Sequence, residues 1–392
     1  MISVNQALSL ILSTEITSKS KTLPITEAFN KTLSVNIHSP IDMPPFRQSA
    51  MDGYAVKLSD SDSESFLIRG EIKAGDSIDY NLQPGEGVRI FTGARVPDDA
   101  DCIIIQEDTI KIDNRIKVNK TYTKGQNIRP IGEQIKAKEL ALEKGSLLTP
   151  AAIGFLAGIG ISELNVYIPP SVGIIVTGNE LVPLGSKLTD GKVYESNSIQ
   201  LQAALKNEGI EHITYYKVED EYSSTVNTII NALEHNDLIL ISGGISVGDY
   251  DFVAKALEEL KTQEIFYKVK QKPGKPLFYG INQSKHIFAL PGNPASSLTC
   301  FYMYVIPLIH RLSGRKKIGL QKDAARLRED LIKKGDRAQF FKAYVHNRSC
   351  QILGGQNSSM LNTFSLANAL AYLPEDKSEL KAGEEIEVYL IN

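Results

Sequence analysis

The sequence has little cysteine and no long apolar run, and both absences exclude certain classes of protein. Only three cysteines, Cys102, Cys300 and Cys350, occur in 392 residues. So few, widely spaced cysteines favour a reducing compartment and exclude a disulfide framework or a cysteine-rich metal site. The longest apolar runs, 151–161 and 301–309, are much shorter than the ~20 residues of a membrane span. The N-terminus also lacks the pattern of a secretory signal, so we expect a cytoplasmic protein without membrane contact.

An excess of one charge is lacking as well. The chain has 43 Lys and Arg against 46 Asp and Glu, a net charge of −3. This balance gives no global basic field for nucleic acid, so any anion site must be local. The six histidines have no metal-ligand spacing. The chain also lacks a Walker A loop, a G-x-G-x-x-G motif and a nucleophile elbow, which argues against P-loop NTPases, dinucleotide oxidoreductases and serine hydrolases.

The pattern of apolar, β-branched and turn-forming residues along the chain predicts an α/β multidomain protein. Ser3 and Gln6 have capping-box spacing and precede an amphipathic helix. Short β-branched runs, among them 88–92, 102–106 and 110–118, alternate with turn signals and indicate an inserted, mainly β domain at 41–136. The segments on either side of this domain, 1–40 and 137–170, are expected to form an N-terminal α/β linker region. It should contain a helix within 145–168 and end at the Pro169-Pro170 pair.

Strands and helices alternate regularly after that boundary. We expect strands at 172–177, 212–218, 237–242 and 265–269, and helices at 197–207, 225–234 and 250–260. This alternation predicts a doubly wound, mostly parallel sheet domain at 171–315. The remaining residues, 316–392, return to β texture and predict a small C-terminal β-barrel-like domain.

Four glycine-containing loops each follow a predicted strand. Any one of them could be a simple βα turn, but four at the carboxyl edge of one sheet predict a cleft for a phosphate or another oxyanion. The loops are 177–180, 242–249, 272–276 and 291–294.

Lysines accompany the third loop. Lys268, Lys272 and Lys275 recur along one predicted strand and its turn. Lysines also protect exposed sheet edges, which is the structural alternative. Lys275 favours the anion site because Gly274 and Pro276 hold it in a rigid turn.

Carboxylates near the predicted strand ends could hold Mg²⁺, which keeps several waters and bridges to phosphate. The candidates are Glu180, Asp220, Asp249 and Asp251. For Asp249, capping of the following helix is an equally good explanation.

The strongest local signal is the segment at 43–55, MPPFRQSAMDGYA. It displays an acid, an arginine and two aromatic side chains around the Asp52-Gly53 turn, more than a structural turn needs. Its Pro-Pro-Phe-x-x-Ser-Ala-Met-Asp-Gly-Tyr-Ala pattern resembles the signature of the molybdopterin molybdenumtransferases, bacterial enzymes similar to the E domain of gephyrin. Further matches follow in family order, so the resemblance covers nearly the whole chain; they lie at 90–94, 132–133, 177–181, 242–248, 272–276, 290–294 and 364–368.

The resemblance implies a four-part subunit in an elongated homodimer. Its active site would lie between the doubly wound domain of one subunit and the β domain of the other. The implied reaction takes adenylylated molybdopterin and molybdate, hydrolyses the adenylate with Mg²⁺, inserts molybdenum into the dithiolene and releases AMP. The implied protein contacts are transient, with the molybdopterin adenylyltransferase and with molybdoenzyme chaperones.

The resemblance also implies site residues. The catalytic set is Asp52, Thr92, Glu180, Asp220, Asp251, Lys268 and Lys272. The metal set is Glu180, Asp220 and Asp251. The set that binds the pterin nucleotide or molybdate is Lys275, Pro276, Arg337, Ser358, Gly243, Gly244 and Ser246. The cations and the hydroxyl of Ser358 suit molybdate, a tetrahedral dianion.

The chain departs from the family pattern at Gln134 and Asn179, where the family often has aspartate. Two other functions remain open on the sequence. One is a non-catalytic, gephyrin-like scaffold, which would have no need of the acids and lysines. The other is a molybdopterin adenylyltransferase, which would have no need of the N-terminal signature or the C-terminal β domain.

Overall fold

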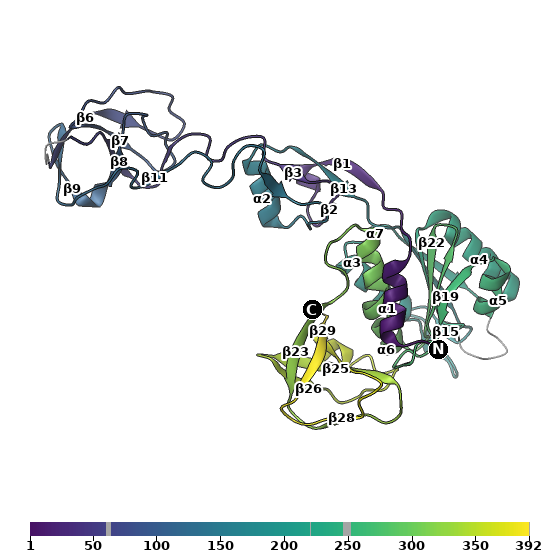
Figure 1. The fold of residues 1–392 in the computed structure, drawn as a ribbon. Coiled ribbons are helices and arrows are strands. Elements are labelled where there is room, and N and C mark those ends of the chain that lie inside the picture. The colour runs from purple at the N-terminus through teal and green to yellow at the C-terminus, as the bar shows by residue number, and fades with distance from the viewer. Residues whose placement is uncertain (60–63, 220, 246–251, 392) are drawn as a thin grey trace.

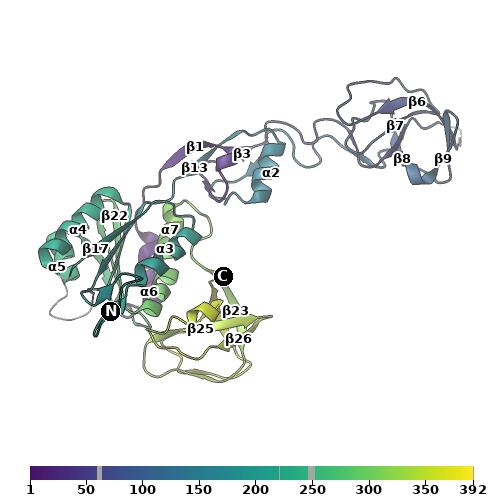
Figure 2. The same ribbon diagram turned by 180° about the vertical axis from the view of Figure 1, so that it is seen from behind.

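The fold is described by a computed structural model that covers residues 1–59, 64–219, 221–245 and 252–391. The chain is elongated: the inserted β domain lies at one end, the linker region in the middle, and the sheet domain with the C-terminal β domain at the other end (Figure 1). The view from behind shows the same order (Figure 2). The expected α/β multidomain fold is confirmed.

The first helix, α1 (Val4–Ser13), begins with the predicted capping box of Ser3 and Gln6. Its buried face, which includes Ala7 and Ile11, packs with α7 (Ile306–Leu312) in the core of the sheet domain. The helix therefore packs with the sheet domain, although our division of the chain places it in the linker region.

The linker region is a small sheet with one helix beside it. The order of its strands is β1-β13-β2, and short β3 and β12 pair next to it. The helix expected within 145–168 is only nine residues long, because it begins at Pro150 and the positive φ of Gly160 follows its end. The elements are β1 (Ser20–Pro24), η1 (Ile25–Glu27), β2 (Thr32–Leu33), β3 (Ile37–His38), β12 (Leu140–Leu142), α2 (Pro150–Gly158) and β13 (Glu163–Tyr167).

The inserted domain is a six-stranded sheet in the order β8-β5-β7-β6-β10-β9. The β-branched run at 110–118 forms an antiparallel hairpin, in which Asp113 turns the chain with a φ of +52°. The elements are β4 (Gln48–Ser49), β5 (Gly53–Val56), β6 (Ser65–Ile72), β7 (Glu86–Ile90), β8 (Cys102–Ile105), η2 (Gln106–Asp108), β9 (Thr109–Ile112), β10 (Arg115–Val118) and β11 (Ile128–Arg129).

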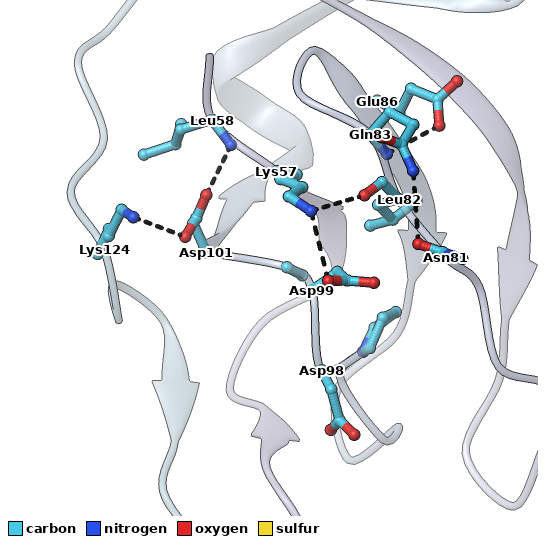
Figure 3. A network of polar contacts seen from close by, with 12 residues as sticks. Lys57, Leu58, Asn81, Leu82, Gln83, Glu86, Asp98, Asp99, Asp101 and Lys124 are labelled. Carbon is cyan, nitrogen blue, oxygen red and sulfur yellow. Dashed lines mark hydrogen bonds and ion pairs between the residues drawn. The ribbon is translucent and has the colours of Figure 1, made fainter. Parts of the chain in front are cut away.

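A polar network fixes the turns of this domain around the end of β5 (Figure 3). The Lys57 ammonium donates to the Leu82 carbonyl at 3.0 Å and pairs with the Asp99 carboxylate at 3.3 Å. Asp101 accepts from the Leu58 amide at 2.9 Å and pairs with Lys124 at 3.3 Å. These contacts hold separate turns against one strand.

The sheet domain contains a six-stranded sheet in the order β17-β14-β18-β22-β21-β19. The strands are parallel except β21, which is antiparallel to both neighbours, so the predicted mostly parallel sheet is confirmed. The strands are β14 (Val172–Thr177), β17 (Ile213–Val218), β18 (Leu238–Ser242), β19 (Gln263–Tyr267), β21 (Phe278–Asn282) and β22 (Lys285–Leu290).

Helices cover both faces of this sheet, as a doubly wound fold requires. One face packs on α1, α3, α6, η3 and α7, and the other on α4 and α5. No helix in the described ranges is long and apolar enough to cross a membrane. The remaining elements are β15 (Leu181–Val182), β16 (Val193–Tyr194), α3 (Asn197–Asn207), α4 (Tyr222–His235), α5 (Phe252–Glu259), α6 (Pro294–Cys300) and η3 (Phe301–Val305).

The C-terminal domain is the expected small β-barrel. Five strands close in the order β25-β26-β23-β29-β27, because β27 pairs back to β25. Short β20, from the sheet domain, adds to the outer edge of β25. The elements are β20 (Gln271–Lys272), β23 (Gln321–Leu327), β24 (Leu331–Ile332), β25 (Ala338–His346), β26 (Ser349–Ile352), η4 (Phe364–Leu366), β27 (Ala369–Leu373), β28 (Glu379–Leu380) and β29 (Glu385–Leu390).

Candidate functional site

A cleft of about 660 Å³ opens at the carboxyl edge of the parallel strands. This is the edge at which doubly wound sheets bind ligands. Three of the four predicted loops line it after β14, β18 and β22, and the fourth contributes Pro276. The lining residues are Thr177, Gly178, Glu180, Leu181, Val193, Tyr194, Glu195, Ser196, Asn197, Ser242, Gly243, Gly244, Ile245, Pro276, Pro291, Gly292, Asn293, Pro294 and Ser359.

Glycines at the floor of the cleft are required by close backbone approaches. Gly243 has a φ of +94°, and a Cβ there would lie 2.7 Å from the Thr177 carbonyl oxygen. Gly244 has a φ of +62°, and a Cβ there would meet Val253 at 2.7 Å. The two predicted glycines therefore line the cleft with backbone alone, which leaves room for a ligand to approach it.

Asn197, at the start of α3, ties two of the loops together. Its side-chain amide donates to the Ser242 hydroxyl at 2.8 Å and to the Gly292 carbonyl at 2.7 Å. The sequence analysis did not select Asn197. Its place in a Ser-Asn-Ser run at the start of a predicted helix marks a helix start, and that signal does not by itself indicate a site.

Two carboxylates of the described residues line the cleft. Glu180 is exposed and packs over Gly178, where a Cβ would lie 2.9 Å from its carboxylate oxygen. Glu195, which the sequence analysis missed, accepts from the amide and hydroxyl of Ser198 and so helps to cap α3. Glu180 is thus available at the cleft edge, whereas Glu195 has a structural task.

The other predicted metal ligands and one pterin-site residue cannot be placed. Asp220, Ser246, Asp249 and Asp251 lie outside the described residues. Within the described ranges, no three His, Cys, Asp or Glu side chains cluster as a metal site would require. The donor set present, Glu180, fits a hard cation only together with Asp220 and Asp251, so the metal set stays a prediction.

The three lysines do not lie along one strand, which corrects the sequence interpretation. Lys268 follows β19 with a φ of +65°, and its ammonium lies over the Tyr267 ring at 4.4 Å. Lys272 ends β20, which pairs with β25 of the C-terminal barrel. Lys275 is exposed in the next turn.

The loop at 272–276 reaches the cleft for a different reason from the other three. It does not follow a strand of the large sheet, as we expected, but leads into β21. Because β21 is antiparallel to β22, its first residues lie at the edge where the parallel strands end. Pro276 lines the cleft there, and the exposed Lys275 precedes it.

A buried polar triad anchors this loop from below. The Gln271 side chain is fully buried and donates to the Gly274 carbonyl at 3.1 Å. The Tyr304 hydroxyl donates to the amide oxygen of Gln271. Gly274 has a φ of +82°, and a Cβ there would meet the Cys300 sulfur at 2.5 Å. The loop that carries Lys272 and Lys275 is therefore fixed to the core.

Replacing Tyr304 with phenylalanine is expected to loosen this loop. The substitution leaves the buried amide oxygen of Gln271 without its donor, which costs about 1–3 kcal/mol. Hydrogen exchange of the amides at 271–277 should become faster, and the melting temperature should fall. Tyr302→Phe is the matched control, because the Tyr302 hydroxyl has no hydrogen bond in the described part of the chain. Equal exchange in the two variants would contradict the anchoring role of Tyr304.

The C-terminal barrel brings Arg337 and Ser358 to this side of the sheet domain. Arg337 is half-buried and donates to the Gln271 carbonyl at 3.3 Å, beside the lysine loop. The Ser358 hydroxyl accepts from the Asn293 side chain at 3.0 Å, and the neighbouring Ser359 lines the cleft. These two predicted residues lie next to the loops at 272–276 and 291–294.

Asp52 and Thr92 lie in the inserted domain, at the opposite end of the chain from the cleft (Figure 1). The exposed Asp52 carboxylate accepts from the Thr92 amide at 2.7 Å and from the Thr92 hydroxyl at 2.8 Å. These hydrogen bonds, with a smaller contribution from Arg89, lower the pKa of Asp52. Asp52 and Thr92 therefore contact each other, but within one chain they lie far from Glu180.

Arg89 supports this pair from below. Its guanidinium lies 5.0 Å from the ring centres of Tyr54 and Phe91 and donates to the Gly53 carbonyl at 3.1 Å. The two aromatic rings and the arginine hold the turn next to Asp52. Arg47 of the signature segment, which we expected among the displayed groups, is structural instead, since it donates to carbonyls of the neighbouring turn at 97–100.

Removing the Thr92 hydroxyl is expected to raise the pKa of Asp52. The lowered pKa keeps the Asp52 carboxylate charged in the neutral range. In Thr92→Val one hydrogen bond to the charged form is lost, and in Thr92→Ser it is kept. Carboxyl-carbon NMR titration should give a higher Asp52 midpoint in Thr92→Val only. The same midpoint in both variants would contradict the role of the hydroxyl.

Comparison with known proteins identifies the class of this fold and cleft. Residues 173–311 match a probable molybdopterin-binding domain, residues 2–160 match the MoeA N-terminal region (domains I and II), and residues 324–391 match the MoeA C-terminal region (domain IV). The chain is thus a molybdopterin-binding α/β protein. Along the sequence, one β domain precedes its sheet domain and another follows it.

Curated relatives and solved structures match over the full length. The molybdopterin molybdenumtransferase of Haemophilus influenzae is 34% identical over 100% of this chain and 99% of its own. That of Staphylococcus aureus is 30% identical over 99% and 95%. A structure of the molybdopterin biosynthesis MoeA protein from Pyrococcus horikoshii is 31% identical, with a TM-score of 0.82 over 100% of this chain and 99% of its own. The chain belongs to the MoeA family, the molybdopterin molybdenumtransferases of molybdenum cofactor biosynthesis.

Proposed function

We propose that the cleft at the sheet edge binds adenylylated molybdopterin and molybdate, and that the enzyme hydrolyses the adenylate, inserts molybdenum into the dithiolene and releases AMP. The observation that carries this proposal is the convergence of four loops on one cleft within a full-length MoeA fold, the fourth of them a basic loop that contributes Pro276. Glycine backbone at 243–244 suits close approach of a phosphate, and the lysines beside it balance the charge of anionic substrates.

The two substrates are assigned to different parts of this site. The pterin nucleotide occupies the cleft along Gly243, Gly244 and Pro276, with Ser246 as a further predicted contact. Molybdate binds beside it, between the loop that carries Lys272 and Lys275 and the barrel residues Arg337 and Ser358, which bond the Gln271 carbonyl and the Asn293 side chain. Lys268 contributes positive charge at the same segment.

Mg²⁺ is the proposed metal cofactor, held by Glu180 with Asp220 and Asp251. Its chemistry there is charge stabilisation at the phosphate. The departures from the family pattern bear on this shell unequally. Asn179 is next to Glu180, and its carbonyl accepts from Lys192 at 2.7 Å, whereas Gln134 is exposed near the end of the inserted segment at 41–136. We therefore expect Asn179 rather than Gln134 to affect the metal.

The complete site is proposed to need a homodimer. Asp52 and Thr92 are far from their own cleft, so a second copy would have to supply them (Figure 1). Large apolar side chains are exposed on the segment that contributes Val193 and Tyr194 to the cleft, and that copy would cover them; they are Leu184, Leu188, Val193, Tyr194 and Ile199. Transient contacts with the adenylyltransferase and with molybdoenzyme chaperones, and a cytoplasmic location, remain part of the proposal.

Product analysis tests the proposed reaction. Purified protein is incubated with adenylylated molybdopterin, molybdate and Mg²⁺, and we expect AMP and molybdenum-loaded cofactor in equal amounts. A parallel incubation with molybdopterin and ATP tests the adenylyltransferase alternative, which would form the adenylylated pterin. A scaffold would give no product in either incubation. Loss of AMP release in Glu180→Gln, with the fold retained, would support the assignment of the cleft.

A further inference from the structure

A buried ammonium group lies beneath the loop that carries Ser358. Lys342, on β25, is only 4% exposed. Its ammonium donates to the carbonyl oxygens of Gly355 at 2.6 Å, Met360 at 2.7 Å and Asn357 at 3.4 Å. All of these partners belong to one loop, 353–361, between β26 and η4. A buried lysine held entirely by the carbonyls of one loop acts on the conformation of that loop.

The position of Lys342 on its strand explains why it faces the loop. Side chains of a strand alternate between two faces. Phe341 and Ala343 point into the barrel core, whereas Ala338 and Phe340 belong to the core shared with the sheet domain. Lys342 has the same parity as Ala338 and Phe340, so it leaves the barrel on the side where the sheet domain packs.

A second anchor holds the start of the loop to the same strand position. The Gln356 amide donates to the Lys342 carbonyl at 2.9 Å and to the Leu353 carbonyl at 2.7 Å, and its oxygen accepts from the Lys342 amide at 3.0 Å. Both the backbone and the side chain of Lys342 therefore bind the loop.

The far side of the loop contacts the cleft. The Ser358 carbonyl accepts from the amides of Ala295 at 3.0 Å and Ser296 at 3.3 Å, at the start of α6. Asn293 contacts the Ser358 hydroxyl, and Ser359 lines the cleft. Helix starts have amides without an intrahelical partner, so the loop satisfies two of them from another domain. The loop thus connects Lys342 to the cleft.

The buried ammonium of Lys342 restricts movement of the loop at 353–361. Burial lowers the pKa of Lys342, because removal from water disfavours its charged form. The carbonyl oxygens compensate by accepting from the ammonium, and each movement of the loop would remove such a partner. The loop is therefore held in one arrangement while the ammonium stays buried.

We propose that Lys342 is a positioning residue for the cleft: it fixes the loop at 353–361 so that Ser358 and Ser359 stay at the cleft edge. This inference rests on the proposed function in one respect: the loop that Lys342 fixes carries Ser358, which is assigned to the proposed molybdate site. It adds a residue that does not itself touch substrate.

The test compares two buried lysines of the same domain. Lys342→Met removes the ammonium beneath the loop. Lys333→Met is the matched control, since Lys333 is 5% exposed and donates to the Pro374 carbonyl, outside the loop. We expect Lys342→Met to raise the half-saturating molybdate concentration about tenfold with kcat changed much less. Hydrogen exchange of the amides at 295–296 should become faster in Lys342→Met and stay unchanged in Lys333→Met.

A double-mutant cycle separates this proposal from the proposed molybdate site. If Lys342 acts through Ser358, the combination of Lys342→Met with Ser358→Ala should be no worse than the more impaired single variant. An effect of Ser358→Ala without one of Lys342→Met would overturn the positioning role. Unchanged exchange at 295–296, or faster exchange with an unchanged molybdate requirement, would also overturn it. If Ser358→Ala alone has no effect while Lys342→Met does, the role of Ser358 is wrong and the positioning of the loop stands. Gln356→Ala serves the same comparison if Lys342→Met yields too little folded protein.

Discussion

Mixing two inactive variants, Asp52→Asn and Glu180→Gln, is expected to restore activity. Each variant alone lacks one half of the proposed shared site and should release almost no AMP. In a mixed dimer, one of the two sites combines the intact Asp52 of one chain with the intact Glu180 of the other. Random pairing gives half mixed dimers, so about a quarter of all sites should be intact. AMP release by the two variants, co-expressed in equal amounts and purified without selection for the mixed dimer, measures this fraction.

A second pairing provides the control for that experiment. Glu180 and Lys275 belong to the same sheet domain, on the same side of the shared site. At a molybdate concentration too low to occupy the site of Lys275→Met, Glu180→Gln mixed with Lys275→Met should therefore stay as inactive as either variant alone. Asp52→Asn mixed with Lys275→Met should recover, because these residues come from different chains in each site. Recovery in neither pairing would show that the distal domain of a second copy does not complete the cleft.

Neutralising either Lys275 or Arg337 is expected to weaken molybdate binding by about one to two orders of magnitude. A charge-assisted hydrogen bond contributes roughly 1.5–3 kcal/mol, and this loss corresponds to that factor in affinity. Lys275 lies in the exposed turn before Pro276. Arg337 belongs to the barrel and donates to the Gln271 carbonyl. Lys275→Met and Arg337→Met should raise the molybdate concentration needed for half-maximal cofactor formation, with affinity for the adenylylated pterin changed only a few fold.

Lys270→Met is the control for this measurement. Lys270 lies in the same segment, but its ammonium pairs with Asp336 at 3.0 Å. Its loss should leave the molybdate requirement nearly unchanged. If Lys275→Met or Arg337→Met instead abolishes binding of the pterin nucleotide and leaves the molybdate requirement as it was, these cations bind the phosphate and our placement of molybdate is wrong.

The elements that the sequence predicts in the sheet domain are those with clear local signals, whereas β21, β22, α6 and α7 were not predicted. The helix expected at 197–207 is α3, and the strand expected at 172–177 is β14, each with the predicted bounds. Pairing between distant segments has no such signal. Periodicity could not reveal that β21 is antiparallel, nor that Gln271 and Lys272 pair with a strand of another domain.

The candidate site was predictable to a similar degree. Glycine loops after strands pointed to Gly243 and Gly244, and both line the cleft. Asn197, Glu195 and Lys342 were not found, because each acts through contacts between segments far apart in the chain. Arg337 and Ser358 came only from the family resemblance. A lysine in a β strand gives no sign in sequence of whether its ammonium faces water or a loop of carbonyls.

The burial of all three cysteines bears on competition for molybdenum. Burial raises the pKa of Cys102 to about 12 and that of Cys350 to about 11, and it raises that of Cys300 as well. The thiolate is the form of cysteine that ligates metals, so an exposed, ionised cysteine near the cleft would compete with a dithiolene for molybdenum. These thiols stay protonated and out of reach at neutral pH. The protein can therefore deliver an oxidised, thiophilic metal to a sulfur ligand without retaining it on its own side chains.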